Sequence, residues 1–282
     1  MSRYNSLCLS GGAMRGFELL GALSYLSEII NLKCIDKFYG TSIGSMICYL
    51  LAIGYSSTEL LIEISTATFW DKLRNVNVMQ MIQDGSCSSF TPIQEFLEKI
   101  TIKKIGKLIN MEQLKNDFGK ELSVVTYNFS NKCKEVLNYK TNPDIPCITA
   151  IRMSSILPFF FTPFKYGDSF YLDGGLIDPF PISLIEEPKK SISICLSAGD
   201  NESNILQKSN FNPIIYGKQL LDISINHMIE NGINKSKEIG TELINIRNIT
   251  NITSTNFNMT TTEKLDLFSA GYNAAKEQYL VS

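Results

Sequence analysis

The stretch Lys37-Phe38-Tyr39-Gly40-Thr41-Ser42-Ile43-Gly44-Ser45 decides the fold expected for this chain. Its first three residues are typical of a short strand, and an apolar helix is expected at Ser45–Ile53. Between them, five residues fit Gly-x-Ser-x-Gly, the nucleophile elbow that lifts a serine hydroxyl out of a strand-to-helix turn. An ordinary turn between a strand and a helix fits the same five residues almost as well.

A serine nucleophile needs a group that takes its proton, and that group is usually a histidine. The chain has one histidine, His227, which lies in the helical-looking stretch Ile223–Glu230 rather than in a loop after a strand. The order Ser42, Asp173, His227 is nevertheless the order of an α/β-hydrolase triad. The residues therefore leave two bases open, His227 or a carboxylate.

Two further stretches carry residues for the same chemistry. Gly11-Gly12-Ala13-Met14-Arg15-Gly16 follows the first expected strand as a glycine-rich turn. Such a turn can cradle a phosphate, but this one fits neither Gly-x-Gly-x-x-Gly nor the Walker pattern, and its backbone N–H groups suit an oxyanion hole better. Within it, Arg15 would hold the loop, attract an anionic head group or form a plain salt bridge. Asp173-Gly174-Gly175 places a carboxylate at a tight turn whose small residues let another loop approach.

Short apolar segments alternate with longer helical patterns along the chain, which is typical of an α/β sheet. Helices are expected at Phe17–Ile30 and Leu265–Leu280, and another begins at Thr91-Pro92. The polar segment Asn201–Asn212 is expected to be a surface loop. No repeat or linker is evident, so residues 1–282 are expected to form one domain with its core at about 4–196. The expected strands are Tyr4–Leu9, Lys37–Tyr39, Leu122–Phe129, Lys134–Tyr139, Ser191–Leu196 and Glu242–Ile246.

Composition excludes several classes of function. The 26 basic and 28 acidic residues form no block of like charge, so nucleic acid is not an expected partner. No apolar run approaches the roughly 20 residues of a membrane span, and the first residues do not fit a signal peptide. The protein is therefore expected in the cytoplasm, with peripheral contact to membranes. The seven dispersed cysteines indicate reduced core thiols, and together with a single histidine they favour neither a metal site nor a cofactor.

Taken together, the motifs resemble those of the patatin-like phospholipases, which share their catalytic core with the cytosolic phospholipase A2 group. That family carries a glycine-rich loop, then Gly-x-Ser-x-Gly, then Asp-Gly-Gly or Asp-Gly-Ala. This chain has all three in that order. The stretch Ala150–Phe161 is also similar to the family's serine-containing segment before Pro-x-x-Phe. The likeness spans about Tyr4 to Leu196.

The resemblance implies a patatin-like α/β fold, a three-layer α/β/α sandwich around a mostly parallel sheet. It implies a Ser–Asp dyad without histidine, in which Ser42 is the nucleophile and Asp173 the base. The glycine-rich loop would form the oxyanion hole and contact substrate. One departure is Ala13, which replaces the third glycine of that loop; alanine keeps the N–H group but penalises a positive φ. The residues so implied for the loop are Gly11, Gly12, Ala13 and Arg15, and those supporting the motifs are Gly40, Gly44 and Gly174.

The implied activity is lipid acyl hydrolysis of the phospholipase A type, with a phospholipid or related polar lipid ester as the substrate. Such a substrate implies transient contact with a membrane surface. Two alternatives stay open, a Ser-His-Asp carboxylesterase that uses His227 and a non-catalytic lipid-binding or storage protein. Acyl transfer to an acceptor other than water is open as well, and the sequence indicates no oligomeric state.

Overall fold

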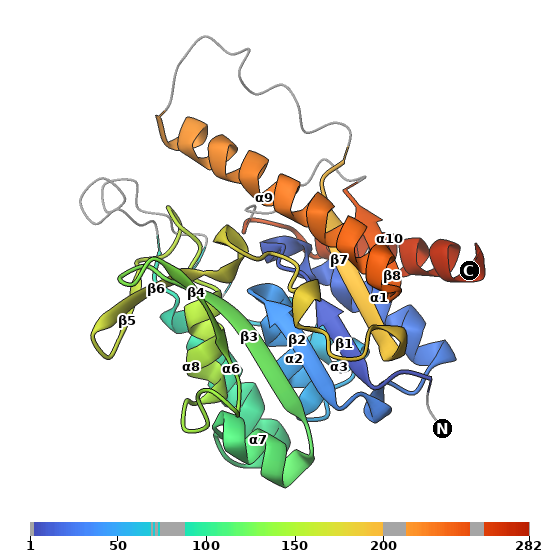
Figure 1. Cartoon of the computed structure of the whole chain (residues 1–282), viewed down its shortest axis with the longest axis horizontal. Coiled ribbons are helices and arrows are strands. Elements are labelled where there is room, and N and C mark those ends of the chain that lie inside the picture. The colour runs from blue at the N-terminus through green and yellow to red at the C-terminus, as the bar shows by residue number, and fades with distance from the viewer. Residues whose placement is uncertain are drawn as a thin grey trace.

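The centre of the protein is a sheet whose core strands run parallel (Figure 1). The computed structural model describes residues 3–68, 70, 73, 88–199, 213–248 and 257–281. Within these ranges, five strands pair in parallel in the order β8-β7-β1-β2-β3. Three more strands, β4, β5 and β6, extend the sheet in antiparallel fashion. The strands are β1 (Ser6–Leu9), β2 (Lys37–Thr41), β3 (Glu121–Asn128), β4 (Cys133–Leu137), β5 (Phe164–Tyr166), β6 (Ser169–Asp173), β7 (Ser191–Ser197) and β8 (Glu242–Arg247).

Strand β3 pairs with three strands, and this pairing positions the site. Its residues 121–125 pair with β2, its residues 126–128 pair with β6, and its residues 124–128 pair with β4. Because β4 overlaps both of the others along β3, β2 and β6 must share the opposite edge of β3. Parallel β2 ends there opposite Val125, and antiparallel β6 ends there opposite Thr126. The carboxyl ends of β2 and β6 therefore meet head to head.

Helices cover both faces of the sheet, which gives three layers (Figure 1). Alternation along the strands decides which side chain meets which layer. In β1, Leu7 and Leu9 belong to the larger core, whereas Cys8 belongs to a smaller core with Ile229 and Ile233 of α9. The helices are α1 (Gly16–Ile29), α2 (Ile43–Ala52), α3 (Ser57–Ser65), α6 (Thr91–Ile105), α7 (Met111–Phe118), α8 (Cys147–Ser154), α9 (Pro213–Ile239) and α10 (Thr261–Val281), with short 3-10 turns η1 (Ala13–Arg15), η2 (Leu32–Cys34), η3 (Gly174–Leu176), η4 (Ile182–Leu184) and η5 (Pro188–Lys190).

The expected α/β/α sandwich and its strands are confirmed within one or two residues, and β4 pairs with β3 as the turn between them predicted. The interpretation of the cysteines as core thiols is wrong for Cys34 and Cys133, which are exposed. Cys34 is the last residue of the 3-10 turn Leu32–Cys34, and Cys133 is the first residue of β4. Cys87 lies outside the described residues. The expected loop at 201–212 lies outside the described residues. Among the helices that are described, none combines the length and the hydropathy needed to cross a bilayer.

Candidate active site

Ser42 lies between the end of β2 and the start of α2, in the strained backbone conformation that an elbow requires. Its φ of 53° and ψ of −125° are rare for a residue with a side chain. The turn is also tightly packed, because a Cβ atom on Gly40 would lie 2.6 Å from the Ser45 nitrogen, and one on Gly44 would lie 2.5 Å from the Leu9 oxygen. Both motif glycines are therefore required by close backbone approach.

The end of β6 brings Asp173 to the serine, 131 residues away in the chain. The Ser42 hydroxyl donates a hydrogen bond to Asp173 Oδ2 across 2.7 Å. After Asp173 the chain turns across the end of β3, and a Cβ atom on Gly174 would lie 2.2 Å from the Val125 oxygen. Gly174 is thus the residue that lets this turn close against β3 and β2.

Asp173 is buried, with 4% of its surface exposed. Desolvation raises its pKa to about 6, against two hydrogen bonds that favour the charged form. Oδ2 accepts from the Ser42 hydroxyl, and Oδ1 accepts from the Gly175 N–H group across 2.7 Å. At neutral pH the carboxyl group is ionised. Its Oδ2 then accepts a hydrogen bond from the hydroxyl whose proton a base would remove. This is the arrangement that a general base needs.

Ser154, at the end of α8, supports the elbow through a contact that none of the three motifs indicates. Its Oγ accepts a hydrogen bond from the Ser42 N–H group across 2.8 Å, and the side chain is fully buried. The bond satisfies a backbone donor that the strained turn would otherwise leave unpaired. The signal that could have found Ser154 was the serine-containing stretch Ala150–Phe161, which gave a likeness but no contact.

The glycine-rich loop lies against the elbow: a Cβ atom on Gly11 would be 3.6 Å from Ser42 Cβ, and Ala13 lines the same hollow as Ile43. The Gly11 N–H group donates to the Pro179 oxygen across 2.8 Å, so Gly11 drops out of the expected set. Within the described residues, no acceptor is bonded to the N–H groups of Gly12 and Ala13. Ala13 has a φ of 46°, the left-handed conformation that a glycine would occupy without penalty.

Arg15 does not face a substrate, which corrects its expected role in binding. The side chain is buried, and its guanidinium donates to Glu18 Oε2, to the Ser197 oxygen and to the Ile246 oxygen at 2.8, 2.8 and 3.0 Å. Those carbonyls end β7 and β8, so Arg15 ties the loop to the carboxyl end of the sheet. Burial raises the pKa of its partner Glu18 to about 7, against the attraction of Arg15.

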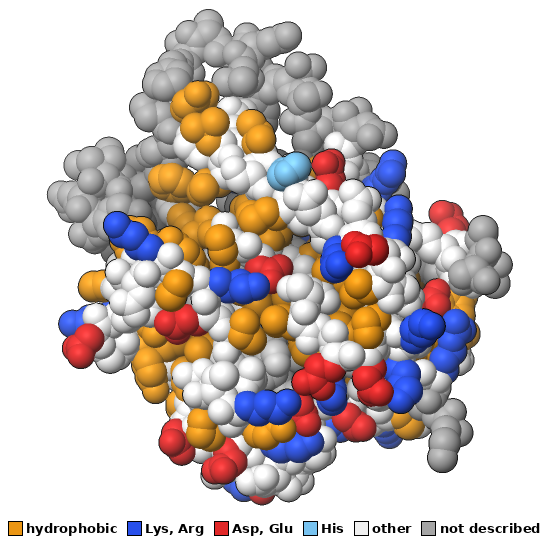
Figure 2. Space-filling view, viewed as in Figure 1, with side chains coloured by type: hydrophobic (Ala, Val, Ile, Leu, Met, Phe, Trp, Pro, Cys, Tyr) orange, Lys and Arg blue, Asp and Glu red, His pale blue; other side chains and the backbone are white. Residues whose placement is uncertain are grey.

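His227 lies on α9 with an exposed side chain, as the pale blue patch of Figure 2 shows. No hydrogen bond joins it to Ser42 or Asp173 in the part of the chain that the structure describes. The other carboxylate near the turn, Asp178, has a structural partner instead: its Oδ2 accepts from Lys134 Nζ across 3.1 Å.

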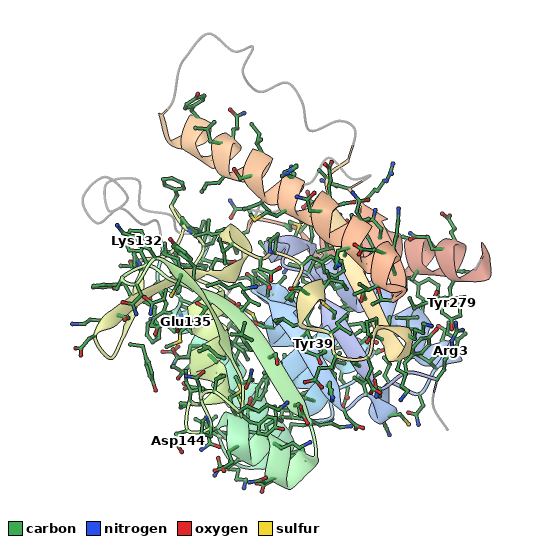
Figure 3. The ribbon with its side chains drawn as sticks, viewed as in Figure 1. Arg3, Tyr39, Lys132, Glu135, Asp144 and Tyr279 are labelled. Atoms are coloured by element: carbon green, nitrogen blue, oxygen red, sulfur yellow. The ribbon has the colours of Figure 1, made fainter. Side chains whose placement is uncertain are left out.

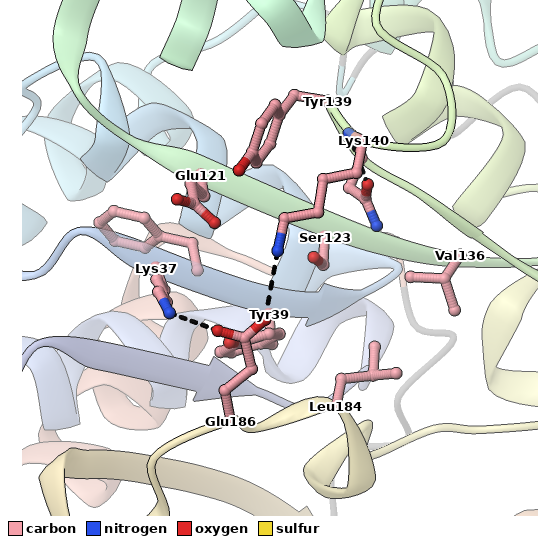
Figure 4. A pocket seen from close by; sticks show the side chains of 11 residues that line it. Lys37, Tyr39, Glu121, Ser123, Val136, Tyr139, Lys140, Leu184 and Glu186 are labelled. Carbon is pink, nitrogen blue, oxygen red and sulfur yellow. Dashed lines mark hydrogen bonds and ion pairs between the residues drawn. The ribbon is translucent and has the colours of Figure 1, made fainter.

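Among the described residues, a small hollow adjoins the site and a larger one lies away from it. A small apolar hollow of about 30 Å³ is lined by Ala13 of the glycine-rich loop and by Ile43, the residue after Ser42, and reaches Trp70. A larger one of about 140 Å³ opens on the face of β2, β3 and β4 (Figure 4). Its Glu186 is ion-paired with Lys37 and Lys140. Since Lys37 and Glu121 begin β2 and β3, this hollow lies toward the amino ends of the strands. The larger hollow therefore belongs to the surface away from Ser42.

The profile of a family described as patatin-like phospholipase matches residues 7–185. A probable lipid hydrolase, 463L, of Invertebrate iridescent virus 6 is 37% identical over 188 residues, which are 64% of this chain and 63% of that protein. An uncharacterised protein of Acanthamoeba polyphaga mimivirus is 27% identical in an alignment of 298 positions, gaps included, that covers 99% of this chain and 95% of that protein.

Among solved structures, VipD from Legionella pneumophila superposes with a TM-score of 0.61 at 16% identity. The superposition covers 98% of this chain and 66% of VipD. This chain thus spans slightly less than two thirds of VipD, and the similarity supports the fold alone.

We expect Ser154→Ala to destabilise the protein by about 1–3 kcal/mol, because it leaves the buried Ser42 N–H group without an acceptor. Ester turnover should fall as well, since the elbow loses its support. The matched control is Ser155→Ala, whose buried Oγ has no hydrogen-bond partner among the described residues. Urea denaturation that finds the two variants equally stable would contradict this role of Ser154.

Ala13→Gly should stabilise the protein by about 0.5–1 kcal/mol. Relief of the left-handed strain at φ 46° outweighs the greater flexibility that glycine gives to the unfolded chain. Thermal and urea denaturation of the variant beside the parent protein measure the difference. A lower free energy of unfolding for Ala13→Gly would show that the loop bears no such strain.

Proposed function

The chain belongs to the patatin-like phospholipase family, and on that premise we propose that it hydrolyses fatty-acyl esters of lipids with a Ser42–Asp173 dyad. The observation that carries the proposal is the 2.7 Å hydrogen bond from the Ser42 hydroxyl to a buried carboxylate at a strained elbow. Backbone strain and a buried carboxylate both lower the free energy of unfolding, and a turn with a purely structural role needs neither.

The chemistry follows from these contacts. Ser42 Oγ attacks the ester carbonyl while its proton passes to Asp173 Oδ2. The N–H groups of Gly12 and Ala13 and the amino end of α2 stabilise the negative oxygen of the tetrahedral intermediate. The intermediate collapses, and the leaving alcohol takes the proton from Asp173. A water molecule then gives a proton to Asp173 and attacks the acyl-enzyme. The bond from Ser42 Oγ to the acyl carbon breaks, Asp173 returns the proton to Ser42 Oγ, and the fatty acid is released.

The class of substrate rests on the surroundings of the dyad. The hollow next to Ala13 and Ile43 is lined by apolar side chains, among them Met14, Phe17 and Trp70. At about 30 Å³ the hollow would take only the first carbons of an acyl chain, and its apolar lining would favour these over a charged group. The relative from Invertebrate iridescent virus 6, named a probable lipid hydrolase, supports the same class. A phospholipid or related polar lipid, met at a membrane surface, is the substrate that we propose.

A Ser-His-Asp mechanism has less support, because Asp173 bonds directly to Ser42 and leaves no place for an intervening imidazole. A non-catalytic lipid-binding protein would have no use for a nucleophile with an ionised base beside it. Covalent labelling by a fluorophosphonate probe separates that alternative, since it requires an activated serine.

Ser42→Ala and Asp173→Asn should each lower ester hydrolysis by at least about 10³-fold, because each removes one half of the dyad. Both substitutions are nearly isosteric, so circular dichroism should show a folded chain. His227→Ala is the control and should keep the parent rate. Full activity in either dyad variant, or loss of activity in His227→Ala, would overturn the assignment of the base.

The rate should follow the ionisation of Asp173. Below its pKa of about 6 the carboxyl group is protonated and accepts no proton from Ser42, so kcat/KM should fall about tenfold per pH unit. Above that pKa the profile should be level. Measurement in the His227→Ala variant excludes the titration of the imidazole from the profile. A limb that disappears in this variant would assign the titration to His227 instead.

A further inference from the structure

The exposed aromatic side chains of the described residues gather at one end of the molecule. Five rings are between 39% and 55% exposed, and we call them the aromatic rim: Phe129, Phe159, Tyr166, Phe170 and Tyr216. All the other large apolar side chains with comparable exposure are aliphatic. Figure 2 shows the apolar surface concentrated over the upper part of this face, whereas charged side chains dominate its lower part.

Three rings of the rim lie on the tips of two hairpins that extend past the dyad. Phe129 directly follows β3, and its N–H group donates to the Phe170 oxygen across 2.8 Å. Tyr166 and Phe170 flank the turn between β5 and β6. Thr126 of β3 pairs with Asp173, so the tips begin only three residues beyond the position where β2 and β6 meet.

The fourth ring connects the hairpins to α9. Phe159 lies three residues after Ile156, whose oxygen accepts the Asp173 N–H group across 2.9 Å. Its φ of 66° is rare for an aromatic residue, so the surrounding fold holds the ring in place at some cost. The ring lies against Gly217, where an added Cβ atom would be 3.4 Å from Phe159 Cζ.

The first half of α9 continues the same apolar surface. Tyr216, Leu220 and Ile223 follow one another at spacings of four and three residues, which places them on one face of the helix. They are 41%, 48% and 66% exposed, and the first fully buried side chain described on α9 is Ile229. In Figure 1 this half of α9 projects beyond the sheet.

Charged side chains are arranged differently at the two ends of the sheet. The ion pairs of Lys37 with Glu186 and of Lys115 with Glu121 lie at the amino ends of β2 and β3. At the rim, Lys132 and Lys165 form no ion pair with any described carboxylate, and Lys165 Nζ lies 6.0 Å from the Phe170 ring. Figure 3 shows Lys132 at the β3–β4 turn, far from Asp144 beside α7. Asp168 lies in the β5–β6 turn between Tyr166 and Phe170, so with Lys132 and Lys165 the two tips carry two positive charges and one negative, a net charge of +1. Rings beside a net positive charge complement a bilayer whose headgroups are anionic.

We propose that the aromatic rim is a docking surface for an anionic lipid bilayer and seats the dyad end of the protein on it. The inference rests on the proposed function, since a bilayer is where a phospholipid substrate would be met. The rings would enter the interface between headgroups and acyl chains, and Lys132 and Lys165 would stay at the level of the phosphates.

Vesicle flotation of the full chain tests the docking. The binding arm carries Ser42→Ala, so that no lipid is hydrolysed, and uses vesicles of phosphatidylcholine with and without phosphatidylserine. Phe129→Ser with Phe170→Ser should lower the vesicle partition coefficient by about tenfold or more. The matched control is Ile102→Ser with Leu108→Ser, whose parent side chains are 50% and 46% exposed near α7, away from the rim. Lys132→Gln with Lys165→Gln should remove the preference for phosphatidylserine.

Equal flotation of the rim variant and the control variant, or no flotation of the parent, would overturn the proposal. So would a dimer in sedimentation velocity that the rim substitutions dissociate without any vesicle binding, because a second copy would then occupy the surface. Hydrolysis of a water-soluble short-chain ester, measured with Ser42 intact, should be unchanged in the rim variant. If the parent floats but neither hydrolyses that ester nor reacts with a fluorophosphonate, the proposed function fails and the docking surface stands.

Discussion

The structure depends on a constraint at a single edge of β3. Parallel β2 and antiparallel β6 share that edge and end at neighbouring positions, opposite Val125 and Thr126. Two strands that run toward each other along one edge must turn away where they meet, and both turns must be tight. Ser42 and Asp173 are the residues at those turns, so the register of β3 alone brings the hydroxyl and the carboxylate into contact. A shift of either strand by one residue would turn its side chains to the opposite face and separate them.

The strained backbone at this meeting point costs free energy, and contacts from neighbouring segments stabilise it. Ser42 holds a φ of 53°, a conformation that persists only where surrounding contacts enforce it. Ser154 Oγ accepts a hydrogen bond from the Ser42 N–H group, and Gly40 and Gly44 leave the space that the turn needs. Arg15 fixes the glycine-rich loop to the carbonyls of Ser197, the last residue of β7, and Ile246, the next to last of β8. The strain is thus local, while the contacts that maintain it come from four separate parts of the chain.

Burial sets the pKa of Asp173, and the two ends of the sheet differ in the polarity of their surfaces. Burial raises the pKa of Asp173 to about 6, which makes the carboxylate a stronger base, while the hydrogen bonds from Ser42 and Gly175 favour its ionised form. The same end of the sheet exposes the aromatic rings and Lys132 and Lys165, whereas ion pairs such as Lys37–Glu186 cover the other end. Backbone strain, a buried carboxylate and exposed rings therefore coincide at the carboxyl end of the strands, where α/β sheets generally place their sites.

By itself the sequence determined the alternation of strands and helices and the three motifs, because each depends on local backbone preference: an apolar run, a glycine turn, a proline at a helix start. The scarcity of histidine also pointed from Ser42 to a carboxylate before any contact was known. Only the tertiary structure decided which groups are free to act. Gly11 and Arg15 belong to the same loop as Gly12 and Ala13, yet Pro179 and the ends of β7 and β8 occupy their donors. Ser154 gained its contact with Ser42 across 112 residues in the same way. Hydrogen bonds between distant segments are fixed by strand register and packing, and no local pattern in the chain encodes which partner a buried donor will find.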